Sequence, residues 1–281
     1  MINAINSSYQ SLHSADLMNK YTSNLNSSMT RLTSGMRINS AADDPSAMAA
    51  SQRIRDRIGG LEQATENVQN DSTILKMADN AYTNVGNLIT KLRELAVKSA
   101  DDGTEATERA TLKDEATQIL AQIDSYANLK YNDRAIFGTF NFQIGPEANN
   151  YMNVQTQNFT AKDLGIEAAD TKIGVQADAK GLLDSFDVAA GTVTKGALTT
   201  ALDTIITAQQ KVGAYENTMG FISDDINTQV TNLQAADSNL RDVDVAKEMT
   251  SYVRNSVLLQ TSQLILAQHN QNAFSVLNLL K

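Results

Sequence analysis

Residues 54–96 read IRDRIGGLEQATENVQNDSTILKMADNAYTNVGNLITKLRELA, and apolar side chains recur at every seventh position of this stretch. The series consists of Ile54, Leu61, Val68, Leu75, Tyr82, Ile89 and Ala96. Sustained spacing of this kind predicts helices that lie side by side with a slight left-handed supercoil. As one helix, the stretch would be about 64 Å long. Gly59 and Gly60 lie inside it, and we expect them to bend or loosen the helix.

Two further series in the C-terminal part of the chain continue this pattern. The first consists of Leu198, Ile205, Val212, Met219, Ile226, Leu233 and Leu240, and the second of Val245, Tyr252, Leu259, Leu266, Ala273 and Leu280. The chain has only two prolines, Pro45 and Pro146, so little interrupts a long helix. These observations predict a mainly α fold, in which long heptad-patterned helices pack as a coiled-coil-like rod.

The middle of the chain has a different character. Phe140, Phe142 and Ile144 alternate with polar residues before Gly145 and Pro146, which predicts a small β-hairpin region at about residues 136–159. A shorter helix is expected at about 105–126, with Thr104 as its N-cap. Residues 164–196 lack clear periodicity and contain several glycines, so we expect a short, irregular, exposed insertion.

Composition excludes several classes of partner. The net charge of −9 and the absence of a basic footprint argue against a nucleic-acid partner. Without cysteine, neither disulfides nor thiolate chemistry is available. The N-terminus lacks a Sec-type signal pattern. Residues 255–280 carry no charge but hold many Gln and Asn, so we expect helix-packing surface and no membrane insertion.

The two ends of the chain share one physical property. Residues 1–15 and 255–280 are helical in pattern and free of charged side chains. Because a lone amphipathic helix is marginal in water, we expect the ends to pair with each other and with neighbouring subunits, and to order on assembly. The expected domains are therefore residues 1–40 with 245–281 as paired terminal helices, 41–163 with 197–244 as a helical rod, and 164–196 as the insertion.

No catalytic or metal-binding pattern emerges from the residues. His13 and His269 lie within helical stripes and do not form an H-E-x-x-H site, and neither a phosphate-binding loop nor a G-x-S-x-G elbow occurs. The paired acids at 43–44, 101–102 and 224–225 are interpreted as helix caps or solvated charge. We therefore expect no enzyme, no cofactor and no metal. Periodicity alone leaves an ordinary helical bundle open as an alternative, whereas an adhesin would need a larger exposed domain than residues 164–196 provide.

Several short motifs, in order along the chain, resemble bacterial flagellin. Residues 31–44, RLTSGMRINSAADD, are similar to the family's N-terminal pattern, and residues 240–246, LRDVDVA, to its C-terminal one. Further similar stretches are LRELAV at 92–97, FQIG at 142–145, LAQHNQ at 266–271 and VLNLLK at 276–281. The resemblance covers roughly residues 1–160 and 196–281.

This resemblance implies a structural subunit that polymerises into the extracellular flagellar filament for motility. It also implies export in an unfolded state through the flagellar type III apparatus, with an export chaperone, a filament cap and hook-junction proteins as partners. The insertion at 164–196 is short, so the outer domain would be very small or absent. Pro45, directly after Asp43 and Asp44, resembles the hook–filament junction proteins, which are therefore the alternative.

For self-assembly we predict apolar positions at both ends: Ile5, Leu12, Leu25, Leu32, Leu259, Leu266, Leu277 and Leu280. Polar contacts at the joint between shells of the filament are predicted for Arg31, Arg37, Asp43, Asp44, Arg241, Asp242 and Asp244. Which of these side chains meet is left open.

The resemblance further implies recognition by the vertebrate innate receptor for flagellin. The expected contacts are Lys91, Leu95 and Glu115. The family usually has Gln-Arg where this chain has Thr90 and Lys91. Because Lys lacks the planar fork of Arg, we predict weakened recognition.

Overall fold

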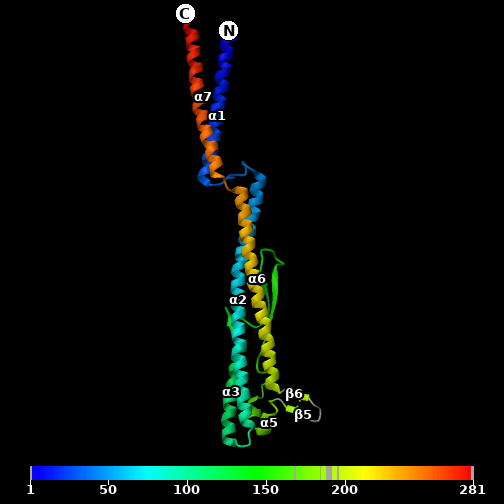
Figure 1. The fold of residues 1–281 in the computed structure, drawn as a ribbon. Coiled ribbons are helices and arrows are strands. Elements are labelled where there is room, and N and C mark those ends of the chain that lie inside the picture. Colours follow the sequence, from blue (N-terminus) through cyan, green and yellow to red (C-terminus); the bar gives the residue numbers. More distant parts are fainter. Residues whose placement is uncertain (1, 168, 184, 188–191, 195, 280–281) are drawn as a thin grey trace. The chain divides into compact units, whose positions relative to one another are not determined.

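The computed structural model describes residues 2–167, 169–183, 185–187, 192–194 and 196–279. Five long helices dominate: α1 (Ile2–Ser34), α2 (Pro45–Ala100), α3 (Ala106–Ala127), α6 (Ala197–Arg241) and α7 (Val245–Leu279). Figure 1 shows that α1 and α7 run alongside each other in opposite directions, as do α2 and α6. The mainly α fold with long helices is therefore confirmed.

Short strands form three antiparallel pairs in the middle of the chain. These are β1 (Lys130–Tyr131) with β2 (Arg134–Ala135), β3 (Gly138–Gln143) with β4 (Tyr151–Thr156), and β5 (Ser185–Asp187) with β6 (Thr192–Thr194). The predicted hairpin is β3–β4, in which Phe140 is opposite Val154 and Phe142 opposite Met152. Phe140, Phe142 and Val154 are buried, because alternate residues of each strand face the helices.

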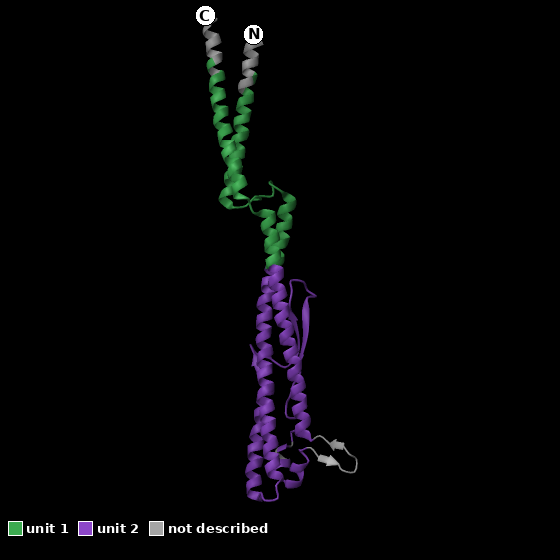
Figure 2. Ribbon diagram, in the orientation of Figure 1, with its two compact units in different colours: residues 1–58, 231–281 green, residues 59–230 purple. Residues whose placement is uncertain are grey.

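The chain divides into two compact units, coloured separately in Figure 2. Unit 1 comprises Met1–Ile58 and Thr231–Lys281, and unit 2 comprises Gly59–Val230. Unit 2 contains most of α2 and α6, all of α3 and the strands. Unit 1 contains the terminal helices α1 and α7 with the adjoining ends of α2 and α6.

The seven-residue series form the core of unit 2. The α2 series is buried at Leu61, Val68, Leu75, Tyr82, Ile89 and Ala96, and the α6 series at Leu198, Ile205, Val212, Met219 and Ile226. The Tyr82 ring packs against Phe137 and Phe159, with centroids 5.5 and 5.2 Å away. Its hydroxyl donates a hydrogen bond of 2.6 Å to the Gln157 carbonyl, so the buried phenol is satisfied.

α2 continues through Gly59 and Gly60, and Gly60 has a packing role as well. A Cβ added at Gly60 would lie 2.6 Å from Cβ of Pro146 in the β3–β4 loop. The missing side chain therefore gives the hairpin tip room to approach the helix.

Two further expectations differ from the structure. The N-cap position of α3 is Glu105, and the Thr104 hydroxyl instead donates 2.8 Å to the Lys98 carbonyl in the preceding turn. The segment expected to be irregular contains α4 (Ala169–Ile173) and α5 (Gln176–Lys180). Leu164, Ile166, Ile173 and Leu182 are buried, and α4 packs on α3, so a large part of the segment belongs to the core of unit 2.

None of the helices in the described part of the chain has the length and apolarity needed to cross a membrane.

Candidate assembly surface on the terminal helices

The seam between α1 and α7 is narrow and contains small residues. Ser14 and Ser28 of α1 and Ser262 of α7 are its most buried side chains. Leucines of both helices flank these serines and are half-buried: Leu25, Leu32, Leu259 and Leu266. Because serine is small, the two helix backbones can approach closely at the seam. The seam therefore holds the terminal helices together with little apolar burial.

The joint, residues 35–44 and 241–244, connects the terminal helices to the rest of unit 1. Gly35 ends α1 in the left-handed region, at φ +72°, where glycine is the favoured residue. The Val243 amide then donates to the Gly35 carbonyl at 3.0 Å, and the Arg37 amide to the Arg241 carbonyl at 2.5 Å. Met36 and Asp242 form an antiparallel bridge between the same segments. The two connections therefore pair like short strands.

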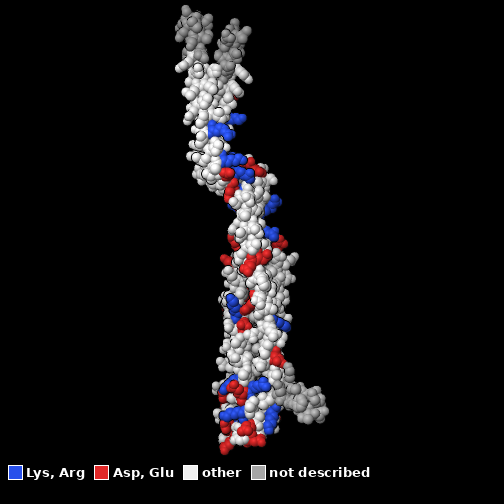
Figure 3. Space-filling view, in the orientation of Figure 1, with Lys and Arg blue, Asp and Glu red and all other residues white. Residues whose placement is uncertain are grey.

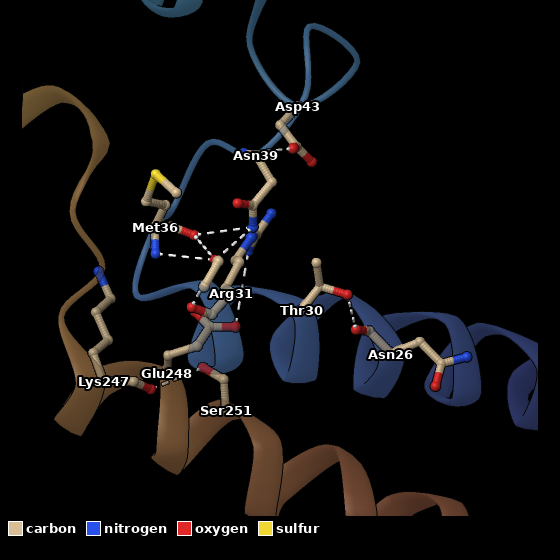
Figure 4. A network of polar contacts seen from close by, with 10 residues as sticks. Asn26, Thr30, Arg31, Met36, Asn39, Asp43, Lys247, Glu248 and Ser251 are labelled. Carbon is tan, nitrogen blue, oxygen red and sulfur yellow. Dashed lines mark hydrogen bonds and ion pairs between the residues drawn. The ribbon is translucent and has the colours of Figure 1, made fainter.

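The arginines of both terminal motifs lie at this joint. Figure 4 shows Arg31 of α1 pointing toward Glu248 of α7, and the two charged groups are 3.9 Å apart. The Arg37 guanidinium donates to the Leu240 carbonyl at 2.7 Å, where α6 ends. Arg241 is buried, and its guanidinium nitrogen lies 3.1 Å from the Met36 sulfur. The cations thus bind the ends of the helices within one subunit.

Asp43 fixes the turn that leads out of the joint. Its carboxylate accepts the backbone N–H groups of Ser40 at 2.9 Å and Asn39 at 3.1 Å. These hydrogen bonds favour the charged form, so they hold the pKa of Asp43 below its usual value. The Asn39 amide in turn donates to the Ser34 hydroxyl at 2.9 Å, which extends the network to the end of α1 (Figure 4).

Three further acids of the motifs act at helix ends. Asp44 accepts two backbone N–H groups of the first turn of α2, at 3.0 and 2.9 Å. Asp244 accepts the Lys247 amide at 3.1 Å and caps α7 in the same way. Asp242 accepts the Ser238 hydroxyl at 2.5 Å at the end of α6. Six of the seven predicted polar residues therefore lie in the joint, Arg31 lies just before it at the end of α1, and each has a partner within the same chain. Their contacts between shells of the filament stay a prediction.

A second apolar face of α7 lies outside the seam. Val245, Met249, Val253 and Val257 follow one another at a spacing of four residues, Leu264 continues the row, and all five are exposed. We call these residues the α7 row. Residues three or four apart are neighbours on a helix surface, so Val245 to Val257 form a stripe along the helix, and Leu264 follows two turns later. A helix that is apolar on two sides while one partner covers one side has surface left for further partners.

The eight residues predicted for self-assembly fall into three groups. Leu25, Leu32, Leu259 and Leu266 lie at the seam, and Leu12 is exposed on α1. The side chains of Ile5 and Leu277, and all of Leu280, lie outside the described part of the chain.

The sequence analysis did not identify the α7 row as a surface. The heptad series from Val245 leads to Tyr252, Leu259 and Leu266, which are half-buried in the subunit. Apart from Val245, which begins the series, the row consists of apolar residues that the series does not include. In Figure 3, the described parts of α1 and α7 that lie next to the grey residues show almost no charge.

The residues predicted for receptor contact lie in unit 2. Lys91 and Glu115 are exposed, and Lys91 pairs with Glu94 at 3.4 Å. Leu95 is only 5% exposed, because it lies on the side of α2 that faces the core. The structure therefore offers the two charged side chains, and not the leucine, to a partner of the isolated subunit.

Two models of known protein families match separate parts of the chain. Residues 5–141 match the family model for the bacterial flagellin N-terminal helical region, and residues 196–280 match that for the C-terminal helical region. The segment between the two matches contains α4, α5 and the β5–β6 pair.

Relatives match over most of the chain. Flagellin of Bacillus subtilis strain 168 is 31% identical, with 99% of each chain covered. The flagellar filament 33 kDa core protein of Treponema phagedenis is 32% identical over 90% of this chain and 91% of its own. A putative flagellar hook-associated protein of Vibrio parahaemolyticus shares the fold, with a TM-score of 0.57 at 12% identity, over 71% of this chain and 100% of its own. With both family regions and full-length relatives matched, the chain belongs to the bacterial flagellin family.

Proposed function

We propose that this chain is a structural subunit of the bacterial flagellar filament and acts outside the cell by polymerising with copies of itself. The family supports this role, since relatives over most of the chain are named flagellin or filament core protein. The observation that carries the proposal is the α7 row, an apolar stripe on a helix whose other face already packs on α1. Burial of such a stripe by neighbouring copies would drive polymerisation.

The role is structural and not catalytic. The polar network of Figure 4 joins the end of α1 to the following turn and to α7. The carboxylates of Asp44 and Asp244 cap helices of the same chain. The hook–filament junction role has no comparable support, because the likeness to a hook-associated protein extends to the fold alone.

Further partners follow from this proposal. Export through the flagellar type III apparatus in an unfolded state requires no disulfide, which suits a chain without cysteine. An export chaperone would cover the apolar faces of α7 before assembly, and a cap would guide folding at the filament tip. Hook-junction proteins would meet the first subunits. Recognition by the innate receptor would use Lys91 and Glu115 and would be weakened, since Leu95 is buried.

Substitution of the α7 row tests the proposal. The chain with Val253→Asp and Val257→Asp would be seeded with sonicated filament fragments and followed by electron microscopy and sedimentation. We expect the unsubstituted chain to polymerise and the double variant to stay in the supernatant, because two carboxylates cannot be buried without partners. Val175→Asp is the matched control, since Val175 is similarly exposed but lies in unit 2.

Each outcome separates the possibilities. Polymerisation of the double variant at the wild-type concentration would remove the α7 row from the interface. Failure of the unsubstituted chain to add to seeds would contradict the filament role itself.

A further inference from the structure

Unit 2 carries an exposed aromatic ring that its own chain does not cover. Phe221 of α6 is 76% exposed, the highest value among the described large hydrophobic side chains. Asp224 and Asp225, three and four residues later, lie on the same helix face and are exposed. We call Phe221 with these two acids the α6 knob. Aromatic rings, including Phe, are enriched in the cores of protein interfaces.

A pocket of suitable size opens elsewhere on unit 2. It has a volume of about 220 Å³, where the β1–β2 turn meets α2 and β3. Its floor is apolar, since Ile74, Ile136 and Phe140 are buried. The Arg134 guanidinium lies 4.6 Å from the centre of the Phe140 ring and forms part of the rim. We call it the Arg134 pocket.

Size and charge of the knob and the pocket are complementary. An apolar cavity of about 150 Å³ suffices for a benzene ring, so the Arg134 pocket has room for one phenyl group. A ring inserted there would meet Phe140 and the guanidinium, both of which interact favourably with aromatic rings. The acids of the knob carry the charge opposite to that of Arg134. Asp71 and Asp133 also lie near Arg134, so the buried ring contributes more than the charges do.

We propose that Phe221 of one copy inserts into the Arg134 pocket of a neighbouring copy, which gives the polymer a specific contact between rod units. The inference rests on the proposed function and adds the residues of one interface to it. Knob and pocket lie on different elements of the same unit, α6 on one side and the β1–β2 turn with α2 on the other. Each copy therefore donates one knob and accepts another. Head-to-tail, this contact continues from copy to copy and gives an open helical assembly where its rotation does not close, whereas reciprocal insertion would give a dimer.

Chemical cross-linking tests the contact while the ring stays in place. The chain has no cysteine, so two introduced residues are its only thiols. Thr218→Cys lies one turn before Phe221 on the same face, and Asn132→Cys lies on the pocket rim. Filaments of the double variant would be treated with a short bismaleimide and separated on a denaturing gel. We expect a ladder of dimers, trimers and longer chains, because every copy has both halves of the contact.

The matched control moves one thiol along the same helix face. Thr207→Cys with Asn132→Cys places the α6 thiol about 16 Å away, three turns before Thr218, and we expect its filaments to yield monomers. If filaments of the variant with Thr218→Cys and Asn132→Cys also yield only monomers, the proposed contact between Phe221 and the Arg134 pocket is contradicted. The proposed filament role would be unaffected. If the unsubstituted chain fails to polymerise, the proposed function fails, and this inference with it.

Truncation of the ring gives a second, independent measurement. We expect Phe221→Ala to raise the critical concentration for seeded growth about tenfold, as removal of an interface anchor does. The ring is exposed in the subunit, so its loss should leave thermal unfolding of the monomer unchanged. Ile206→Ala, at another exposed apolar position of α6, is the control and should grow as the unsubstituted chain does. An unchanged critical concentration for Phe221→Ala would overturn the inference.

Discussion

Two carboxyl groups on long helices show how the surroundings of one side chain set its pKa. Burial is the main influence on both. For Asp71 of α2, burial raises the pKa to about 6, and the charge of Arg134 only partly opposes it. For Asp237 of α6, burial also raises the pKa, but hydrogen bonds from Ser51 at 2.5 Å and Arg55 at 2.9 Å bring it below its usual value. Asp237 therefore links α2 and α6 as a charged acceptor. The charged form of Asp71, by contrast, lowers the stability of the fold because its site is partly buried.

We predict that Asp71→Asn stabilises the monomer at pH 8 and not at pH 4. The folded state binds the Asp71 proton up to about pH 6 and the unfolded state only up to about pH 4, so stability falls as the pH rises between these values. Asn removes that loss. Because Asp71 is only half-buried, we expect about 1 kcal/mol at pH 8, less than the full shift would give.

Urea unfolding at both pH values would measure this effect. Asp133→Asn in the exposed β1–β2 turn is the control and should change little at either pH. An equal effect of Asp71→Asn at pH 4 and pH 8 would show that the ionisation of Asp71 is not its source.

At the scale of elements, the sequence predicts those helix faces whose partner lies in the same chain. The seven-residue series of α2 and α6 are buried in unit 2 as their spacing indicates, since each helix covers the other. The β3–β4 hairpin was predictable for a similar reason: alternation of Phe140 and Phe142 with polar residues marks a strand with one buried face.

Elements whose partners are distant in the chain were harder to predict. The helices α4 and α5 are five residues each, too short for a periodic signal. α4 packs on α3, which is far away in sequence, and α5 packs on α4. The α7 row was hidden for a related reason, since a series of seventh positions identifies only one side of a helix. The spacing of apolar residues within a helix therefore does not show which other segment or subunit packs on it.

We predict that Ile173→Ala in α4 lowers the free energy of unfolding by about 2–4 kcal/mol, because it leaves a cavity at a fully buried site. The Ile173 carbonyl also accepts a hydrogen bond from the Ser99 hydroxyl of α2. α4 is therefore held both by this bond and by its packing on α3. Val175→Ala, two residues later at an exposed site, should cost less than about 0.5 kcal/mol. Urea unfolding of both variants would measure these losses in the free energy of unfolding. Equal, small losses for the two variants would mean that the segment is exposed and irregular and that α4 is not part of the core.

At the scale of the whole chain, the apolar core is distributed unequally. The largest fully buried side chains, among them Tyr82, Phe159 and Ile123, all belong to unit 2. Among the described hydrophobic residues of unit 1, only Ile38 is buried; the other buried side chains there are serines and Arg241. Because apolar burial is the main source of stability, unit 1 has little of its own.

Hydrogen exchange of the full-length chain, before and after assembly, should therefore distinguish the two units. We expect amides of α1 and α7 in the monomer to exchange at least about a hundredfold faster than those around Leu75 and Ile89 of α2, because a lone helix pair with a thin seam opens easily. In filaments, burial of the α7 row should slow them to a similar rate. Slow exchange already in the monomer would mean that the seam and joint suffice to fold unit 1. Fast exchange that persists in filaments would mean that the terminal helices do not form the interface, and assembly would then have to rest on unit 2, where the α6 knob and the Arg134 pocket lie.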